Sequence, residues 1–426
     1  MADHVGPPDV TELGREAEVM IRALAVIGSE NGHLTRLYLT PQHRLAADLV
    51  GRWMTQVGLV VSEDALGTVK GRLEQAGGAT NFSRRLLIGS HIDTVNDAGA
   101  YDGTLGVIAG ILAVREIIRR RGPMPFGIDM LAFGDEEGSR FPATLLCSQA
   151  VAGHFDPASL AVESVDGVRL EEALRRYGKD PALIREAAYD KDEVAAYVEV
   201  HIEQGPVLEQ QDEALGVVTA IASQSRHTVT VVGEAGHAGT VPMGLRRDAL
   251  AATAEMALAI ESLALRHADD FMVATIGKLN TWPGASNVIP GRTVFTVDLR
   301  AQTDLARREA VAWLGDEIMA IAKRRGVTAW VERTHEADAR PCDPVLQAGF
   351  AGAIIRQSGK AVHLPSGAGH DGQAIGALCP IGMLFVRCRG GISHSPAEFT
   401  SVKDMGQAIA ALIDFIENFD PTKVPD

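Results

Sequence analysis

The sequence has few cysteines, few aromatic residues and no excess of positive charge. Its 426 residues include four cysteines, and no two of them form a CxxC pair. This argues against a disulfide framework and against a cysteine zinc site, and it favours a reducing compartment. Lys and Arg total 40 against 55 Asp and Glu, a formal charge of −15. An acidic chain without a long basic run is a poor candidate for binding nucleic acid or an anionic membrane.

Long apolar segments are also missing. No stretch approaches the ~20 apolar residues that a membrane span needs. The first ten residues, MADHVGPPDV, lack the basic and then apolar order of a secretory signal. The composition, 46% hydrophobic and 22% charged, is typical of a globular protein. We therefore expect a cytoplasmic protein, and a chain of this length suits two or three domains.

The first half of the chain alternates apolar strands with helices. Strands are predicted over 85–90, 128–133 and 195–200. A helix over 40–54 precedes them, and another over 103–121 ends at Gly122-Pro123. The alternation returns after about residue 343 and closes with a helix over 401–419. This pattern predicts an α/β fold with a mixed, largely parallel sheet that helices cover.

The pattern differs between residues 214 and 333. Strands are predicted over 227–233, 272–279, 292–299 and 327–332. Two strong helices, 247–267 and 304–325, lie between them. The order favours an inserted α+β domain with both helices on one face of an antiparallel sheet. We therefore expect a main domain split into 1–213 and 334–426, with a second domain, 214–333, inserted into it.

Polar residues gather near the ends of the predicted strands and the starts of helices, at the edge where open α/β sheets bind ligands. The clusters are GSHIDTV (89–95), AYDG (100–103), DEE (135–137), HIEQGP (201–206) and GISHSP (391–396). Residues two apart on a strand point the same way. Asp93 can therefore bond one nitrogen of His91 and leave the other for a metal ion.

The acidic triplet Asp135, Glu136 and Glu137 follows an apolar strand, and Arg140 is the first cation after it. Divalent cations would turn such mutually repelling carboxylates into ligands. Histidine and carboxylate donors without cysteine fit catalytic Zn²⁺ or Mn²⁺. Two cations can share a bridging carboxylate and a water whose pKa they lower, and a spare glutamate can act as general base. Taken singly, each cluster has an ordinary interpretation as a turn, a helix cap or a solvated loop.

Taken in order, the segments GSHIDTV, AYDGTLGV, FGDEEGSRF, HIEQGPVLE, GEAGHAGT and ISHSPAE resemble the M20-type metallohydrolases. They are most similar to the hydantoinase/carbamoylase branch, which includes N-carbamoyl-L-amino acid hydrolases, β-ureidopropionases and allantoate amidohydrolases. The resemblance runs from about residue 40 to the C-terminus. It implies a di-metal catalytic domain that is split by an inserted lid and dimerisation domain.

The resemblance implies a ligand set for two divalent cations: His91, Asp102 and His201 for one, and Asp102, Glu137 and His394 for the other, with Asp102 bridging. We expect Zn²⁺ or Mn²⁺, and Co²⁺ or Ni²⁺ also fit the donors. Glu136 matches the general base of the family, and Asp93 matches the residue that orients His91. Asp135 has no role in the family pattern, and we expect it to be structural.

The inserted domain supplies further matches. His237 corresponds to a histidine that reaches the active site of a neighbouring subunit and stabilises the oxyanion, which implies a homodimer. Asn287 and Arg300 match positions that hold the substrate carboxylate, and the planar fork of Arg suits a carboxylate. An ion pair with Asp298 is the competing interpretation of Arg300.

The remaining matches lie in the main domain. Gln204 corresponds to a ligand of the carbamoyl end of the substrate, and Gly367 and Gly369 lie in a loop whose backbone can approach the substrate.

Two features distinguish this chain from the peptidases of the same superfamily. His91 precedes Asp102 by eleven positions, shorter than the usual peptidase interval, and His201 stands where many peptidases have a carboxylate. Both features imply hydrolysis of a ureido C–N bond in a small substrate with a carboxylate, either an N-carbamoyl-L-amino acid or allantoate. An aminopeptidase or dipeptidase is the alternative. A metal-binding scaffold without activity is a third, which Glu136 disfavours because binding alone needs no general base.

Overall fold

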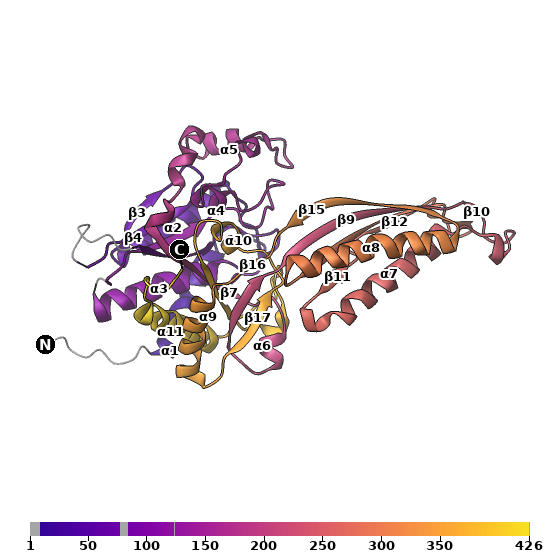
Figure 1. Ribbon diagram of the computed structural model, residues 1–426. Coiled ribbons are helices and arrows are strands. Elements are labelled where there is room, and N and C mark those ends of the chain that lie inside the picture. Colours follow the sequence, from indigo (N-terminus) through magenta and orange to yellow (C-terminus); the bar gives the residue numbers. More distant parts are fainter. Residues whose placement is uncertain (1–8, 77–83, 123, 426) are drawn as a thin grey trace. The chain divides into compact units, whose positions relative to one another are not determined.

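The computed structural model describes residues 9–76, 84–122 and 124–425 (Figure 1). The expectations for the N-terminal eight residues and for Pro123 therefore lie outside the described residues. The described chain forms two compact units, one of residues 1–219 and 341–426 and the other of residues 220–340. The sequence-based boundaries, 213/214 and 333/334, fall earlier than these at both junctions.

The larger unit is built on a nine-stranded mixed sheet in the order β16-β8-β18-β7-β5-β6-β4-β3, with β17 also paired to β8. Its strands are β3 (Val60–Glu63), β4 (Val69–Leu73), β5 (Arg85–His91), β6 (Ile128–Phe133), β7 (Val194–Ile202), β8 (Leu215–Ile221), β16 (Arg340–Pro341), β17 (Val362–Ser366) and β18 (Ile381–Val386). The central strands β18, β7, β5 and β6 are parallel. Antiparallel β8 and β4 flank them on either side.

Helices surround this sheet: α1 (Val10–Ala25), α2 (Pro41–Gln56), α3 (Thr104–Arg121), α4 (Leu146–Val151), α5 (Leu170–Arg176), α6 (Val207–Gln210), α9 (Pro344–Ser358), α10 (Asp371–Ile375) and α11 (Val402–Asn418). Helix α3 is apolar along most of its length and packs on β5, β6 and β7. Helix α11 packs against α1, α3 and α9. The hydrophobic core lies between these helices and the parallel strands.

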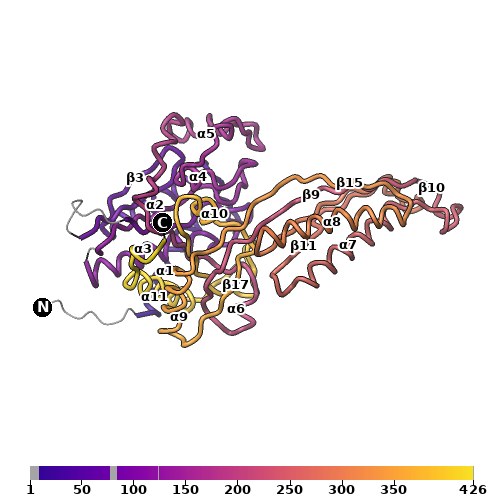
Figure 2. The backbone as a smooth tube through the Cα atoms, viewed as in Figure 1, coloured from indigo at the N-terminus to yellow at the C-terminus, as the bar shows by residue number. Residues whose placement is uncertain are grey.

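The smaller unit contains an antiparallel sheet in the order β11-β14-β9-β15, with β12 also paired to β14. Its strands are β9 (Ser223–Val232), β11 (Val273–Thr275), β12 (Leu279–Trp282), β14 (Arg292–Ala301) and β15 (Thr328–Ala337). Helices α7 (Ala249–Arg266) and α8 (Asp304–Arg325) supply apolar side chains that form one buried core with side chains of the sheet, among them Met256, Val229 and Phe295. Figure 2 follows the backbone of these long strands to β10.

Shorter elements complete the described chain. They are the strand pairs β1 (Ser29–Glu30) with β2 (His33–Leu34) and β10 (Gly236–His237) with β13 (Val288–Ile289), and the 3₁₀ segments η1 (Pro157–Ala161), η2 (Pro181–Ala187), η3 (Lys191–Glu193), η4 (Met243–Leu245), η5 (Ala268–Asp270) and η6 (Arg389–Gly391). Among the described residues, no helix is both long enough and apolar enough to cross a membrane.

The predicted fold class, a mixed and largely parallel sheet covered by helices with an inserted α+β segment, is confirmed. The division between the units differs because β8 pairs with β18 through Leu215, Gly216 and Val217. Strand β15 also continues past residue 333 to Ala337, with a bulge between Arg333 and His335. The single strand predicted over 272–279 is wrong, because this segment contains β11 and the start of β12, which pair with different parts of β14.

Candidate metal centre

Histidine and carboxylate side chains lie at or just after the carboxyl ends of three neighbouring parallel strands. Strand β5 ends at His91, β7 carries His201 next to its last residue, and the acidic triplet follows β6. Strand β5 pairs in parallel with both β6 and β7. These side chains therefore emerge at one edge of the sheet, where open α/β sheets bind ligands.

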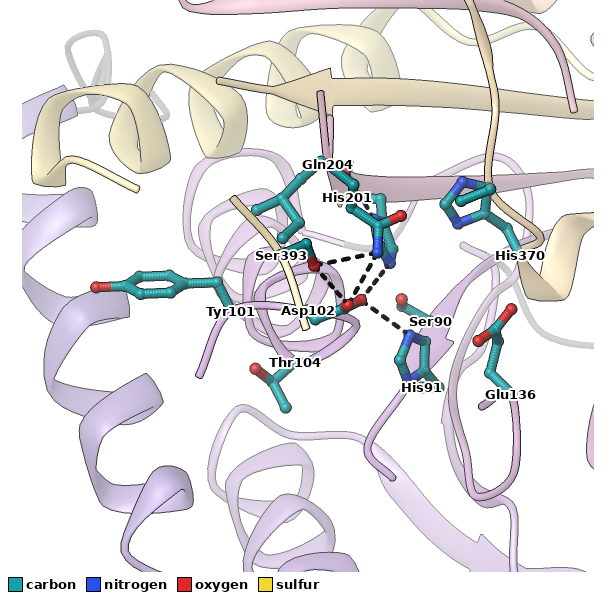
Figure 3. A network of polar contacts seen from close by, with 12 residues as sticks. Ser90, His91, Tyr101, Asp102, Thr104, Glu136, His201, Gln204, His370 and Ser393 are labelled. Atoms are coloured by element: carbon teal, nitrogen blue, oxygen red, sulfur yellow. Dashed lines mark hydrogen bonds and ion pairs between the residues drawn. The ribbon is translucent and has the colours of Figure 1, made fainter. Parts of the chain in front are cut away.

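Asp102 lies at the centre of the cluster and is 6% exposed. Its Oδ1 is 3.5 Å from Nε2 of His91 and 3.1 Å from Nε2 of His201. Its Oδ2 is 3.2 Å from Nε2 of His394. Figure 3 shows His91, His201, Gln204 and Ser393 pointing toward this carboxylate. The two oxygens of Asp102 therefore face different histidines.

Gly103 allows this approach, because it directly follows Asp102 and has φ of 65°. A Cβ at this position would lie 2.5 Å from three atoms of the His91 ring. Only a residue without a side chain lets α3 begin against His91, which is why an Asp-Gly pair stands at this helix start.

Two overlapping sets of donor atoms result, each within 4.8 Å of one another: His91, Asp102 and His201, and Asp102, Glu137 and His394. The structure thus brings together all the residues to which the sequence analysis assigned metal binding. Further sets of the same kind are His91, Glu136 and Glu137, and Glu199, His201 and His370. Histidine and carboxylate donors in overlapping sets suit divalent transition metals.

The charges at the site also favour cations. Burial raises the pKa of Glu136 well above its usual range, and Glu137 and other acids add to the effect. Burial and the charge of Asp102 raise the pKa of Glu137 to about 7. His201 Nε2 is buried and lies 3.1 Å from Oδ1 of Asp102 without a well-aligned hydrogen bond. Buried acids this close are unfavourable unless positive charge compensates them, so the residues present fit bound divalent cations.

Asp93 connects His91 to the acidic triplet. Its Oδ1 and Oδ2 accept hydrogen bonds from the backbone N–H groups of Glu136 (3.1 Å) and Glu137 (3.2 Å). The Nδ1 atom of His91 lies 3.2 Å from the main-chain carbonyl of Asp93 and 3.4 Å from its carboxylate. The structure thus places Asp93 beside His91, as expected, and adds a second contact, to the backbone that carries both glutamates.

Asp135 lies apart from the donor sets. Its carboxylate accepts hydrogen bonds from the N–H groups of Leu146 (3.0 Å) and Cys147 (2.9 Å), at the start of α4. The first acid of the triplet therefore anchors the segment to α4, while Glu136 and Glu137 remain at the site.

The predicted carbamoyl ligand Gln204 also lies at the cluster. Its Nε2 donates to Oδ2 of Asp102 at 2.9 Å and to Ser393 Oγ at 3.2 Å. A Cβ at Gly369 would lie 3.5 Å from Oε1 of Glu136, so this part of the predicted loop adjoins the proposed base. A Cβ at Gly367 would meet no atom of the described residues within 4 Å.

Sequence reasoning missed two buried residues here. The ring of His370 packs edge-on against His201, with centroids 4.4 Å apart. Glu199 accepts hydrogen bonds from the hydroxyl groups of Ser90 and Tyr197, both at 3.0 Å. The two-residue spacing of Glu199 and His201 on β7 would have placed them on one face of the strand. The sequence carries no comparable signal for His370.

The other predicted residues belong to the smaller unit. The exposed His237 ends β10 and pairs with Val288 of β13, and Ala238 N–H donates to the carbonyl of Asn287 at 2.9 Å. Arg300 lies near the end of β14, and Arg292 begins this strand. The carbonyl of Gly291, just before Arg292, accepts a hydrogen bond from the N–H of Gly233.

The ion pair considered for Arg300 is present in the structure. Its Nε and Nη2 lie 3.0 Å and 3.2 Å from the two carboxylate oxygens of Asp298. Arg226 Nε donates to the same carboxylate at 3.0 Å. One carboxylate thus serves two guanidinium groups.

Comparisons with known proteins identify relatives of this chain. The model of peptidase family M20/M25/M40 matches residues 87–418. The chain is 40% identical to an allantoate deiminase of Arabidopsis thaliana over 95% of this chain and 82% of that protein. It is also 40% identical to an N-carbamoyl-L-amino acid amidohydrolase of Geobacillus stearothermophilus, over 89% of this chain and 92% of that protein.

A solved structure is similar along nearly the whole chain. It is an amidase of the hydantoinase/carbamoylase family from Burkholderia multivorans, with a TM-score of 0.88 and 30% sequence identity. The similarity covers 95% of this chain and 97% of that one, so both units have counterparts there.

Proposed function

The chain belongs to peptidase family M20/M25/M40, and we propose that it is a metal-dependent amidohydrolase of ureido compounds. It cleaves the ureido C–N bond of an N-carbamoyl-L-amino acid or of allantoate and releases ammonia and carbon dioxide. The observation that carries this proposal is Asp102, whose oxygens face separate histidines beside the half-buried Glu136. The names of relatives at 40% identity supply the substrate class.

Two divalent cations per chain fit the donor sets, with His91, Asp102 and His201 at one position and Asp102, Glu137 and His394 at the other. Zn²⁺ or Mn²⁺ suits these donors, and Co²⁺ or Ni²⁺ is acceptable to them. When bound, such cations supply positive charge that lowers the pKa of a water molecule and polarises the ureido carbonyl.

Glu136 is the residue proposed to move protons. Glu136 belongs to neither of the two proposed ligand sets. It lies next to Gly369, which belongs to the loop expected to approach the substrate. As a carboxylate, Glu136 accepts a proton from the water that attacks the carbamoyl carbon. It then delivers this proton to the departing nitrogen as the C–N bond breaks.

The substrate contacts are proposed from the smaller unit. Arg300 is oriented by Asp298 through its Nε and Nη2 atoms, and its planar guanidinium group is proposed to bind the substrate carboxylate. His237 is proposed to stabilise the oxyanion, and Asn287, its neighbour through Ala238, to contact the substrate beside it. Gln204 in the larger unit is proposed to bind the carbamoyl end.

The geometry of the smaller unit favours sharing of sites between subunits. Arg292 and Arg300 of β14 are eight positions apart, which at ~3.3 Å per residue is about 26 Å. His237 and Asn287 lie beyond the Arg292 end of that strand. A small substrate cannot touch Arg300 and His237 of one chain, so we propose a homodimer in which they come from different subunits.

The outer face of α7 suits such an association. Leu258 and Leu265 are seven residues apart on one side of this helix and are 67% and 71% exposed. Exposed apolar side chains grouped on one helix face are typical of a surface that another protein covers.

The four cysteines are buried and unbridged, which supports the proposal of a reducing compartment.

An ammonia-release screen tests the function. Metal-stripped protein is supplied separately with Mn²⁺, Zn²⁺, Co²⁺ or Ni²⁺ and assayed on allantoate, N-carbamoyl-L-amino acids and N-carbamoyl-β-alanine. We expect ammonia from at least one ureido substrate, with no release before metal is added. Turnover of dipeptides without ammonia from any ureido compound would instead support a peptidase, and binding of metal without any turnover would support a scaffold.

A further inference from the structure

Glu398 is a buried carboxylate that contacts two of the loops carrying proposed metal ligands. It is 5% exposed. Its Oε1 accepts hydrogen bonds from the backbone N–H groups of Tyr101 (2.7 Å) and Asp102 (3.0 Å). Its Oε2 lies 2.9 Å from Oγ of Ser393, the residue before His394. The Asp102 loop and the His394 loop are thus held by opposite oxygens of one side chain.

Ser393 extends this connection to the bridging carboxylate itself. Its Oγ lies 2.9 Å from Oδ2 of Asp102 as well as 2.9 Å from Glu398. Oδ2 is the oxygen of Asp102 that faces His394. Glu398 therefore acts on Asp102 twice, at its backbone N–H and, through Ser393, at the oxygen that serves the second donor set.

Gly99 provides the space for this carboxylate. A Cβ at position 99 would lie 2.3 Å from Cδ and Oε1 of Glu398 and 2.4 Å from its Cβ. The loop before Asp102 is thus shaped around Glu398, and any side chain at position 99 would displace it.

The His394 loop needs such support because its backbone is strained. His394 has φ of 54°, a left-handed value that is unfavourable for a residue with a side chain. Gly390 and Gly391 before it also have positive φ, of 64° and 66°. Residues in this conformation persist only where surrounding contacts hold them. Half of the His394 side chain is exposed, so packing alone fixes it weakly.

We propose that Glu398 is a positioning residue. It holds the loops of Asp102 and His394 at a fixed distance from each other, so that Asp102, Glu137 and His394 can bind one cation together. This inference rests on the proposed metal centre and deepens it. The position formed by His91, Asp102 and His201 depends less on Glu398, because β5 and β7 fix two of its three donors.

The first test measures metal binding by Glu398→Ala. We expect elemental analysis to show two cations in the wild-type protein and about one in the variant. Calorimetric titration of metal-stripped protein should show the weaker step reduced by about 10- to 100-fold, the usual effect of losing a residue that orients a ligand. Activity should recover as Mn²⁺ is raised, whereas in Glu136→Gln it should not.

Two further variants separate positioning from folding. Glu398→Gln keeps an oxygen for the two backbone N–H groups and a donor for Ser393, so we expect near-normal binding of both cations. Gly99→Ala changes neither a ligand nor Glu398, but its methyl group would displace the Glu398 carboxylate, so we expect the defect of Glu398→Ala. If Gly99→Ala and Glu398→Ala both bind two cations with wild-type affinity, the inference is wrong.

Asp64 offers a matched control. Its carboxylate also accepts two loop N–H groups, those of Leu66 (2.9 Å) and Thr68 (3.0 Å), and its side chain is 7% exposed. Asp64→Ala should lower the melting temperature without changing cation stoichiometry, and an equal loss of the second cation there would overturn the inference. A wild-type protein that binds no cation would instead refute the proposed function.

Discussion

Asp102 presents its two oxygens to different histidines, and this makes both proposed cation positions depend on one side chain. Burial by itself would raise the pKa of Asp102, but contacts with His201, His394 and His91 hold it well below its usual range. The same contacts raise the pKa values of these three histidines. Binding of cations must therefore displace protons from them, and metal affinity should rise with pH until they are neutral.

Replacement of Glu136 by Gln tests its assignment as general base. The amide keeps the size of the side chain but cannot accept a proton. We expect Glu136→Gln to retain both cations by elemental analysis and to lose about 10²- to 10⁴-fold in kcat, the usual contribution of a general base. Survival of full turnover with normal metal content would remove Glu136 from the mechanism.

His43 gives a prediction for the pH dependence of stability. Burial lowers the pKa of this histidine to about 3, and Nε2 has no hydrogen-bond partner among the described residues. In the unfolded chain, His43 binds a proton with a pKa near 6.5, whereas in the folded protein it stays neutral at that pH. Between pH 6.5 and about 3, each unit of acidification should therefore cost about 1.4 kcal/mol of folding free energy.

Urea unfolding at several pH values measures this effect. His43→Gln should show a shallower loss of stability below pH 6.5 than the wild-type protein. The exposed His154 is the control, since His154→Gln should leave the wild-type slope unchanged. Parallel slopes for wild type and His43→Gln would show that His43 is protonated in the folded state.

Most site residues could be predicted because each lies in a short motif next to a strand end or a helix start. His91, Asp102, Glu137, His201 and His394 all belong to segments whose residue types suggest metal binding. Glu398 could not be found in this way, because its partners Tyr101 and Asp102 are 297 and 296 positions away in sequence. Such a contact follows from the tertiary fold and leaves no local pattern.

At the scale of elements, the acidic triplet is positioned by helix α4. Leu145 precedes α4 with φ of 62° and makes no side-chain cap, so Asp135 supplies the acceptors for the first N–H groups of the helix. This explains why three acids occur in a row although the ligand sets need only one and the proposed base another.

Asp135→Ala should destabilise the fold by about 1–3 kcal/mol, because it leaves two buried N–H groups without an acceptor. Urea unfolding of the metal-stripped protein measures this. The exposed Asp180 caps η2 through Ala182 N–H at 3.0 Å and serves as a control. Asp180→Ala should cost less, about 0.5 kcal/mol, the low end for a cap. An equal loss in both variants would show that burial of Asp135 contributes nothing.

Elements with strong end signals were predicted closely. Helix α8 matches its predicted range, because Thr303 caps its start and Gly326 adopts a left-handed conformation at its end. Strand β15 was predicted too short, because its exposed continuation, 333–336, lacks an apolar pattern and is held by pairing with β9. Helix α1 was not predicted, although Asp9 caps it and Leu13, Ala17, Ile21 and Leu24 form a buried stripe.

At the scale of the whole molecule, the proposed exchange of residues between subunits predicts complementation. Chains with His237→Ala and chains with Glu136→Gln should each be inactive alone. In a mixed dimer, one site would combine an intact Glu136 with the partner's intact His237. Random mixing should restore roughly a quarter of wild-type activity, because half of the dimers are mixed and each has one complete site.

Co-refolding of the two variants followed by an ammonia assay measures this recovery. Mixing of Glu136→Gln chains with His91→Ala chains is the control. Each change inactivates the site of the chain that carries it, so the mixed dimer gains no complete site. Equal activity in both mixtures would show that His237 acts within its own subunit.

The length of β14 has a consequence for the newly made protein. In the proposed dimer, a chain that carries Arg300 at one end of this strand and the His237 region beyond the other would supply only part of the substrate contacts to each of two pockets. Monomers released from the ribosome would therefore be inert toward cellular ureido compounds. Specific activity should rise steeply with enzyme concentration around the dissociation constant of the dimer, so dilution below this concentration should inactivate the enzyme.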